Sequence, residues 1–468
     1  MTAGGCHQPF IRLLQSFHGD CPMTITARSR WRHAAVATTL AIGTIACATT
    51  GQAPDRSTVD AAIRSRGLSG IRVDSTAPLP PDASLDDGLT PQEAVAIALW
   101  NSPSFQATLS DLGIARADLV EAGLLRNPIF SLLFPVGPKQ LEWTLQFPLE
   151  VLWQRPKRVA AAQLNAKTVG ERLVWDALTL VAQVRTAHAD AVIADRRLQL
   201  TIEITDLVQR LTGITEARLR AGDISELEAR SARSDAARVQ VARQSIEHDR
   251  NLARLTLAAT LGLDVSTDTL QPLPGPIVDP ATCGTDAARL EDALASRPDV
   301  RAAEIGIEAA AQRARWEQSR TFALIGILDA NGNGDEGFEL GPGVNIDLPI
   351  FSRNQGAIGR AEADVERASR QYAAVRAHVV ADVRSASVRV RQAQQSIAGW
   401  RDDIVPSLEI EQRQAEGAYR AGEIPLLTLL DASRRLVDGR VRLLDAEADL
   451  QRATIALERS IGRACTSR

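Results

Sequence analysis

The sequence predicts an α+β membrane protein in which long coiled-coil helical hairpins alternate with two short β-hairpins. Three observations carry this prediction: an internal repeat of about 200 residues, long helical stretches with almost no proline, and strands of alternating apolar and polar residues. Aromatic residues make up only 4% of the 468-residue chain, which favours helices packed on helices. The formal net charge of −4 gives no reason to expect nucleic acid as a partner.

The N-terminal region is typical of an export signal. Arginines up to Arg32 precede a weakly apolar run over 34–46, and Cys47 follows it. A basic segment followed by such a run predicts a signal peptide over 1–46, with Met23 as the possible true start. Small residues before Cys47 make it a lipidation candidate. The alternative is a short core helix.

Little regular structure is predicted for the segment that follows Ala46. Residues 47–87 are rich in Pro, Asp, Ser and Gly, which indicates a flexible tether. Helical structure is expected from about residue 88, because Thr90 is a good N-cap and Glu93 completes a capping box.

Two halves of the chain repeat the same landmarks in the same order. Arg-Ala-Gly-Asp at 220–223 is echoed by Arg-Ala-Gly-Glu at 420–423, and Leu-Gly at 261–262 is echoed by Ile-Gly at 461–462. Chance does not explain several pairs that all lie about 200 positions apart. The predicted units are a first repeat over 88–270, a Pro-rich linker over 271–285 and a second repeat over 286–464.

Each repeat contains one predicted β-hairpin. Apolar residues occupy every second position from Leu141 to Leu149, and a similar alternation covers 338–348. A period of two indicates a strand with one apolar and one polar face. The partner strands upstream alternate poorly, so their ends are not fixed. The predicted hairpins occupy 129–149 and 322–350.

Each β-hairpin leads into a long helix. Leu180, Val184 and Ala187 begin a run of apolar residues at spacings of four and three, which indicates a coiled-coil seam. Pro406 should kink the second long helix. The predicted helices are a long helix over 156–219 with a return helix over 224–262, and a long helix over 357–419 with a return helix over 424–461, each pair preceded by an initial helix.

The turns between long and return helices carry glycine. Gly222 and Gly422 can take the left-handed conformation that ends a helix. Asp223 and Glu423, with Ser225, are expected to start the return helices.

The strands imply an assembly of several copies. Four strands per chain have edges that cannot stay unpaired in lipid. Two copies would give eight strands with a filled interior, and three would give twelve strands around a lumen.

The chain resembles the TolC-type outer-membrane factor family over about residues 88–464. The resemblance rests on Asn-Ser-Pro at 101–103, Gly-Leu-Leu-Arg-Asn-Pro at 123–128, Leu-Leu-Asp-Ala at 429–432 and the two Arg-Ala-Gly-acid turns. It implies a homotrimer with a barrel in the outer-membrane lipid and a helical tunnel in the periplasm. It also implies a periplasmic adaptor and an inner-membrane pump as partners, without a cofactor. The start of the match looks most like the heavy-metal and RND-linked branch.

The resemblance also assigns candidate site residues. The helix turns match the family's tips, which contact the adaptor; the alternative is capped turns without a partner. Asp431 matches a carboxylate at the tunnel mouth, although Thr428 stands where the family has a second acid. Glu228 is a candidate acid of the first repeat, and ordinary surface acids are the alternative for both. The candidate tip residues are Arg220, Gly222, Asp223, Ser225, Arg420, Gly422 and Glu423.

The predicted function is the outer-membrane channel of a tripartite efflux system, with a type I secretion duct as an alternative. An enzyme is not indicated, because no Ser-His-Asp order, phosphate-binding loop or His-rich metal motif occurs. A soluble periplasmic coiled-coil scaffold would explain the heptads but neither the export signal nor the strands. For Cys283 and Cys465, the sequence leaves open a disulfide or two free thiols. The cargo is not predicted.

Overall fold

The computed structural model describes residues 53–71, 79–81, 83–134, 141–267, 269–276, 278–332 and 338–465. All of them belong to one unit, residues 50–468. The predicted signal peptide, Met23 and Cys47 lie outside the described residues and stay predictions.

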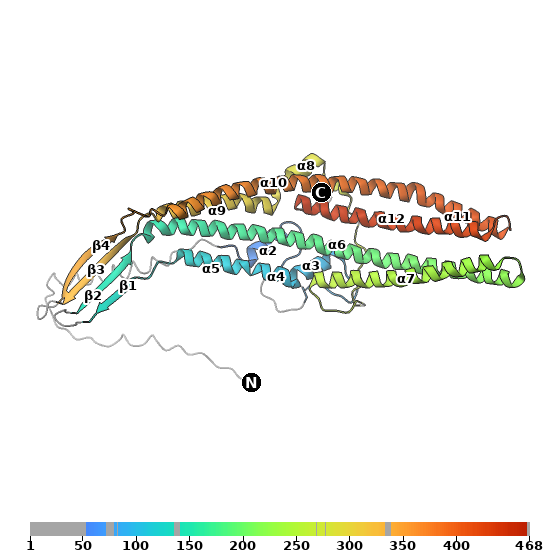
Figure 1. Ribbon diagram of the computed structural model, residues 1–468, viewed down its shortest axis with the longest axis horizontal. Helices are drawn as coiled ribbons and strands as arrows, with labels where there is room; N and C mark the ends of the chain where they lie inside the picture. Colours follow the sequence, from blue (N-terminus) through green and yellow to red (C-terminus); the bar gives the residue numbers. More distant parts are fainter. Residues whose placement is uncertain are drawn as a thin grey trace, which may run out of the picture. The chain divides into compact units, whose positions relative to one another are not determined.

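Two long helical hairpins run side by side, and one four-stranded sheet lies at the end away from the hairpin turns (Figure 1). The first hairpin consists of α6, Val151–Ala221, and α7, Glu226–Leu261. The second consists of α10, Gln355–Ala398, α11, Val405–Arg420, and α12, Leu426–Ile461. The other elements are α2, Arg56–Arg64; α3, Pro91–Asn101; α4, Pro103–Leu109; α5, Asp111–Gly123; η1, Pro280–Cys283; α8, Asp286–Ser296; α9, Pro298–Ser319; β1, Ile129–Leu133; β2, Glu142–Pro148; β3, Leu324–Gly332; and β4, Phe338–Ile346.

Part of the predicted tether is a helix that packs on the first hairpin. Helix α2 begins at a capping box in which the Asp55 carboxylate accepts the Thr58 N–H at 2.9 Å. Val59 and Ile63, one helical turn apart, are buried against the core around α6. The tether prediction is therefore wrong for 56–64, because two apolar residues at helical spacing outweigh a polar composition.

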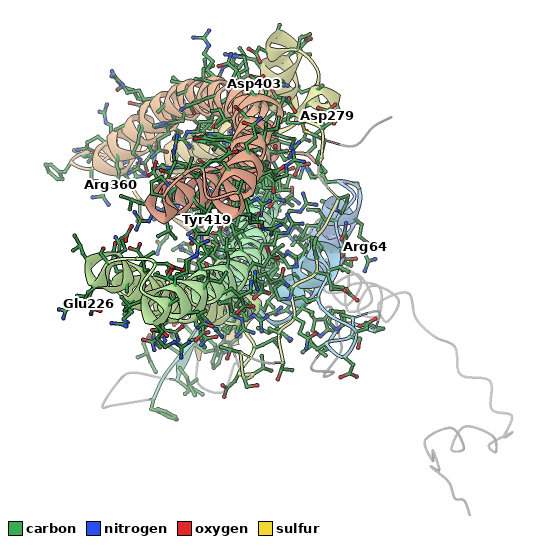
Figure 2. The ribbon with its side chains drawn as sticks, turned by 90° about the vertical axis from the view of Figure 1, so that its right-hand side faces the viewer. Arg64, Glu226, Asp279, Arg360, Asp403 and Tyr419 are labelled. Carbon is green, nitrogen blue, oxygen red and sulfur yellow. A yellow bond between two sulfur atoms is a disulfide. The ribbon has the colours of Figure 1, made fainter. Side chains whose placement is uncertain are left out.

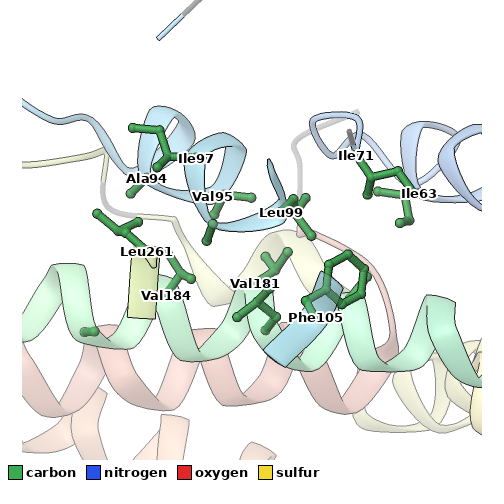
Figure 3. Packing of buried hydrophobic residues seen from close by; sticks show 14 of the residues in the cluster. Ile63, Ile71, Ala94, Val95, Ile97, Leu99, Phe105, Val181, Val184 and Leu261 are labelled. Carbon is green, nitrogen blue, oxygen red and sulfur yellow. The ribbon is translucent and has the colours of Figure 1, made fainter. Parts of the chain in front are cut away.

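The largest apolar cluster lies where α3 crosses α6. Figure 3 shows Val95 and Leu99 of α3 beside Val181 and Val184 of α6. The predicted initial helix of the first repeat is divided into α3, α4 and α5. Its first break falls before a proline, where Ser102 takes an extended ψ of 116°.

Helix α6 begins five residues before its predicted start at Pro156. A contact with another segment stabilises this added turn, because the Arg155 guanidinium donates to the Gly123 carbonyl at 2.7 Å. The Leu149 N–H, just before the helix, also donates to the Leu324 carbonyl at 2.8 Å. These contacts offset the hydrogen bond that proline removes.

The second long helix is interrupted where the sequence predicts a kink. A π-helical turn, Gly399–Ile404, separates α10 from α11 just before Pro406. Proline has no N–H and its ring crowds the carbonyl four residues earlier, so the chain widens at this point. The corresponding helix of the first hairpin, α6, is continuous.

The helices form a row with two open edges. Helix α6 packs on α7 and on α12, and α12 packs on α10 and α11. Nearer the sheet the order is α5, α6, α9, α10. Ion pairs such as Arg185–Glu458 at 2.7 Å and Asp190–Arg452 at 2.8 Å join the hairpins along α6 and α12. One edge therefore carries α5 and α7, and the other carries α10 and α11.

A buried histidine joins three separate segments. His188 Nε2 of α6 lies 2.8 Å from the Leu89 carbonyl oxygen, which also accepts the Leu273 N–H at 2.9 Å. Since the carbonyl can only accept, Nε2 carries the proton. Burial lowers the pKa of His188 below its ordinary value.

We expect this histidine to make the protein less stable as the pH falls below about 6.5. In that range the unfolded chain binds a proton that the buried imidazole does not, so stability rises with pH. His188→Gln removes the titration, and its melting temperature should change less than that of the wild type between about pH 7.5 and about pH 5.5. An equal change in both proteins would assign the pH dependence to other groups.

Candidate functional site

The two hairpin turns have nearly the same backbone geometry. Gly222 has a φ of 80° and Gly422 a φ of 79°. The N–H of Asp223 donates to the Arg218 carbonyl at 3.0 Å, and the N–H of Glu423 donates to the Ala418 carbonyl at 2.9 Å. Each glycine thus closes a left-handed cap that satisfies the last carbonyls of its helix. Apart from the residues next to it in the chain, no atom lies within 4 Å of a Cβ added at either glycine, so the space beside both turns is open.

The return helices start later than predicted. Asp223 and Glu423 lie two residues before the N-caps, which are Ser225 in the first hairpin and Pro425 in the second. The predicted tip residues are exposed, and Arg420 pairs with Glu416 of its own helix. The Ser225 hydroxyl caps α7, whereas the Pro425 ring has no hydrogen-bonding group and α12 has no side-chain cap.

Glu228, a candidate acid of the tunnel mouth, is part of the Ser225 capping box. Its carboxylate accepts the Ser225 N–H at 2.9 Å and the Ser225 hydroxyl at 3.0 Å. These two hydrogen bonds, the N–H first, lower the pKa of Glu228 below its ordinary value. The sequence contained this signal, since Ser followed three residues later by Glu is the capping-box pattern.

Ser225→Ala should loosen the start of α7 without unfolding the protein. Loss of an N-cap hydroxyl costs about 1 kcal/mol, so amide exchange in the first turn should become about fivefold faster. Hydrogen–deuterium exchange of residues 226–229 measures this, with Ser225→Thr as the capping control. Unchanged exchange in the alanine variant would contradict the assigned cap.

Asp431, the other candidate acid, is exposed and paired. Arg435 lies 3.0 Å from its carboxylate and 2.8 Å from that of Glu411. One arginine therefore pairs with two partly exposed acids of the second hairpin.

Contacts between the two hairpins near the tips were not predicted. The Arg218 guanidinium lies over the Tyr419 ring, 4.5 Å from its centre. The buried Asp235 carboxylate pairs with Arg434 of the other hairpin. Figure 2, which looks along the hairpins from the tip end, shows Tyr419 where the second hairpin faces the first and Glu226 farther out. Both pairs join residues about 200 positions apart, so the repeat length is the signal that could have located them.

The sheet has one apolar and one largely polar face. The strand order is β1-β2-β3-β4, all antiparallel, so β1 and β4 are the edges. Cross-strand pairs Leu145–Leu328 and Trp143–Ala330 place apolar residues together, and Thr144–Asp329 lies on the other face with a hydrogen bond of 2.9 Å. The apolar face contains Phe130, Leu132, Trp143, Leu145, Phe147, Leu324, Gly326, Leu328, Ala330, Leu340, Pro342, Val344 and Ile346.

Strand β3 alternates poorly in sequence because it is apolar on both faces over one stretch. The polar face carries Glu142, Asp329 and Glu339, but it also carries Ile325 and Ile327 of β3. Only the pairing with β2 shows which isoleucines share a side with the acids.

Among the described residues no cluster of His, Cys, Asp or Glu is arranged to hold a metal ion. None of the described helices is long and apolar enough to cross a bilayer. The two cysteines that the sequence left open, Cys283 and Cys465, are joined by a disulfide.

A row of long helices with glycine tips is joined to a sheet with one apolar face, whose edge strands β1 and β4 each pair with a single strand among the described residues. Comparison with known proteins gives the following matches. The family described as outer membrane efflux protein matches residues 290–463. This match covers less than half of the chain, and over these residues the chain is similar to outer membrane efflux proteins.

Individual relatives cover most of the chain. The cobalt-zinc-cadmium resistance protein CzcC of Cupriavidus metallidurans is 25% identical over 394 residues, covering 80% of this chain and 90% of CzcC. The crystal structure of the outer membrane protein VceC of Vibrio cholerae has a TM-score of 0.67 at 18% identity, covering 80% of this chain and 97% of VceC. A crystal structure of CusC has a TM-score of 0.66 at 19% identity, covering 85% and 100%. These two likenesses show a shared fold.

Proposed function

We propose that three copies of this chain close into a passive duct that receives cargo from an inner-membrane pump through a periplasmic adaptor. The observation that carries the proposal is the sheet, with its apolar face, its polar face and two unpaired edges. In lipid, an unpaired edge is satisfied only by another strand. Pairing β4 of one copy with β1 of the next would give a barrel of twelve strands around a polar lumen.

The helix layer supports the same closure. Its open edges lie in the same order as those of the sheet, with α7 on the β1 side and α10 and α11 on the β4 side. Large apolar side chains remain exposed on both edges, among them Leu227, 77% exposed, and Val241 on α7, and Val388 and Ile410 on the opposite edge. A neighbouring copy would cover them and continue the helices into a tunnel.

We propose the two glycine turns as the surface that meets the adaptor. Their residues are exposed at one end of the molecule and repeat the same geometry. Of the two candidate mouth acids we favour Asp431, because Glu228 is engaged by Ser225 within its own helix start. Because Arg435 pairs with both Asp431 and Glu411, this group of three side chains keeps one net negative charge.

The relative named for cobalt, zinc and cadmium resistance makes divalent metal cations the first cargo to test. We infer a conduit rather than a catalyst. Acylation at Cys47 stays a proposal, which the mass of the mature N-terminal peptide would test.

Cell fractionation followed by an unheated denaturing gel tests the duct. We expect the protein in the outer-membrane fraction as a species of about three chains, which becomes a single chain on heating. A monomer recovered only in the soluble fraction would overturn the proposal. A gene deletion that lowers resistance to cobalt, zinc or cadmium would support the cargo, and unchanged resistance would exclude those metals only.

A further inference from the structure

The disulfide joins the two ends of the second repeat. Cys283 ends η1 and Cys465 follows α12, with their Cα atoms 4.9 Å apart and 182 positions between them in sequence. The covalent ring therefore contains α8 to α12 and both strands of the second β-hairpin. It encloses the whole predicted second repeat, 286–464.

Both cysteines are buried. Cys283 is 2% and Cys465 4% exposed, in a cluster with Val390 of α10 and with Leu457 and Ile461 of α12. Hydrogen bonds hold the backbone beside them, since the Cys465 N–H donates to the Glu458 carboxylate at 2.8 Å. A protein oxidant cannot reach either sulfur once α10 and α12 have packed, so the bond must form earlier.

The second repeat has little apolar core at this place. Among the described residues the apolar cluster around the disulfide has eight buried members, two of which are the cysteines. The apolar cluster between α3 and α6 in the first repeat has 24. A cross-link over a long loop removes much conformational freedom from the unfolded chain. The disulfide therefore stabilises this part of the second repeat, where the apolar cluster is small.

We propose that a periplasmic thiol–disulfide oxidoreductase closes this ring before the second hairpin packs, and that assembly in the outer membrane requires the closed ring. One cysteine thiolate attacks the disulfide of the oxidoreductase and forms a mixed disulfide. The second thiolate then attacks the sulfur of the first cysteine, and the oxidoreductase leaves as a dithiol. The two protons that the cysteine thiols lose end on the dithiol of the oxidoreductase, which also takes up two electrons, so no proton is released overall. The inference does not depend on which cargo the duct carries.

Thiol labelling tests the order of events. A maleimide polymer of known mass should add two more labels to denatured, reduced wild type than to Cys283→Ala/Cys465→Ala. Native protein treated with a mild reductant should gain neither label. Labelling of both cysteines without reductant would overturn the disulfide, and ready reduction of the native protein would overturn closure before packing.

Assembly tests the requirement. In cells without periplasmic thiol oxidase, the outer-membrane amount of wild type should fall several-fold, and an added small-molecule disulfide should restore it. The double alanine variant should be low in both strains without rescue, and each single variant should equal the double. Normal outer-membrane levels of the double variant would overturn the requirement. These outcomes are separate from the duct proposal, which a failed trimer in wild-type cells would contradict.

Discussion

Val344→Arg is expected to remove the protein from the outer membrane, whereas Asn345→Arg should leave it there. The two residues are neighbours in β4 and point to opposite faces: Val344 pairs with Gly326 on the apolar face, and Asn345 pairs with Ile325 on the other. An arginine facing lipid costs about 2–4 kcal/mol near the middle of a bilayer, and a closed assembly would carry it once per copy. On the lumen face the same charge stays in water.

The measurement is the amount of each variant in the outer-membrane fraction, together with its heat-sensitive migration on a gel. The neighbouring substitution is the control for expression and for added charge. Equal insertion of both variants would show that the apolar face does not meet lipid, and loss of both would show general misfolding.

Gly222→Pro combined with Gly422→Pro should abolish export while the protein still inserts. Proline fixes φ near −65°, far from the 80° and 79° of these turns, and removes the N–H that donates to Leu219 in the first and to Tyr419 in the second. The change costs about 3 kcal/mol or more at each turn, but it falls at the end of the hairpins, far from the sheet (Figure 1). The expected result is lost resistance to the exported compound with normal outer-membrane levels.

Asparagine at both positions is the matched control, because it tolerates the left-handed conformation. Export should then remain near the wild-type level. Unchanged export by the proline variant would remove the tips from the partner surface, and failure of the asparagine variant would mean that the glycines are needed for close approach of a partner.

Features set by local chemistry could be predicted from the sequence. The ends of the long helices at Gly222 and Gly422 follow from the conformation that glycine permits, and the position of the break before Pro406 follows from its missing N–H. The alternation of β2 follows from a strand with two different environments. In the candidate site, the exposed turns are where the sequence predicts them.

Features set by long-range packing could not be predicted. Helix α2 depends on Val59 and Ile63 meeting a surface of α6 that is more than a hundred positions away. The faces of β3 depend on its register with β2, since both Ile325 and Ile327 are apolar. The pairing of Asp235 with Arg434 depends on how the hairpins lie side by side. In each case composition and spacing permit several neighbours, and only tertiary packing selects one.

The π-helical turn between α10 and α11 is a place where the second repeat can accommodate an inserted or deleted residue. A π-helical turn accommodates more residues than the same rise of α-helix, so an insertion or deletion there changes the local winding and not the register of the seam on either side. The long helix α6 of the first repeat has no such turn. An insertion or deletion inside it would rotate the apolar seam of the residues that follow. Length differences among related chains should therefore gather at this turn in the second hairpin and be rare in the first.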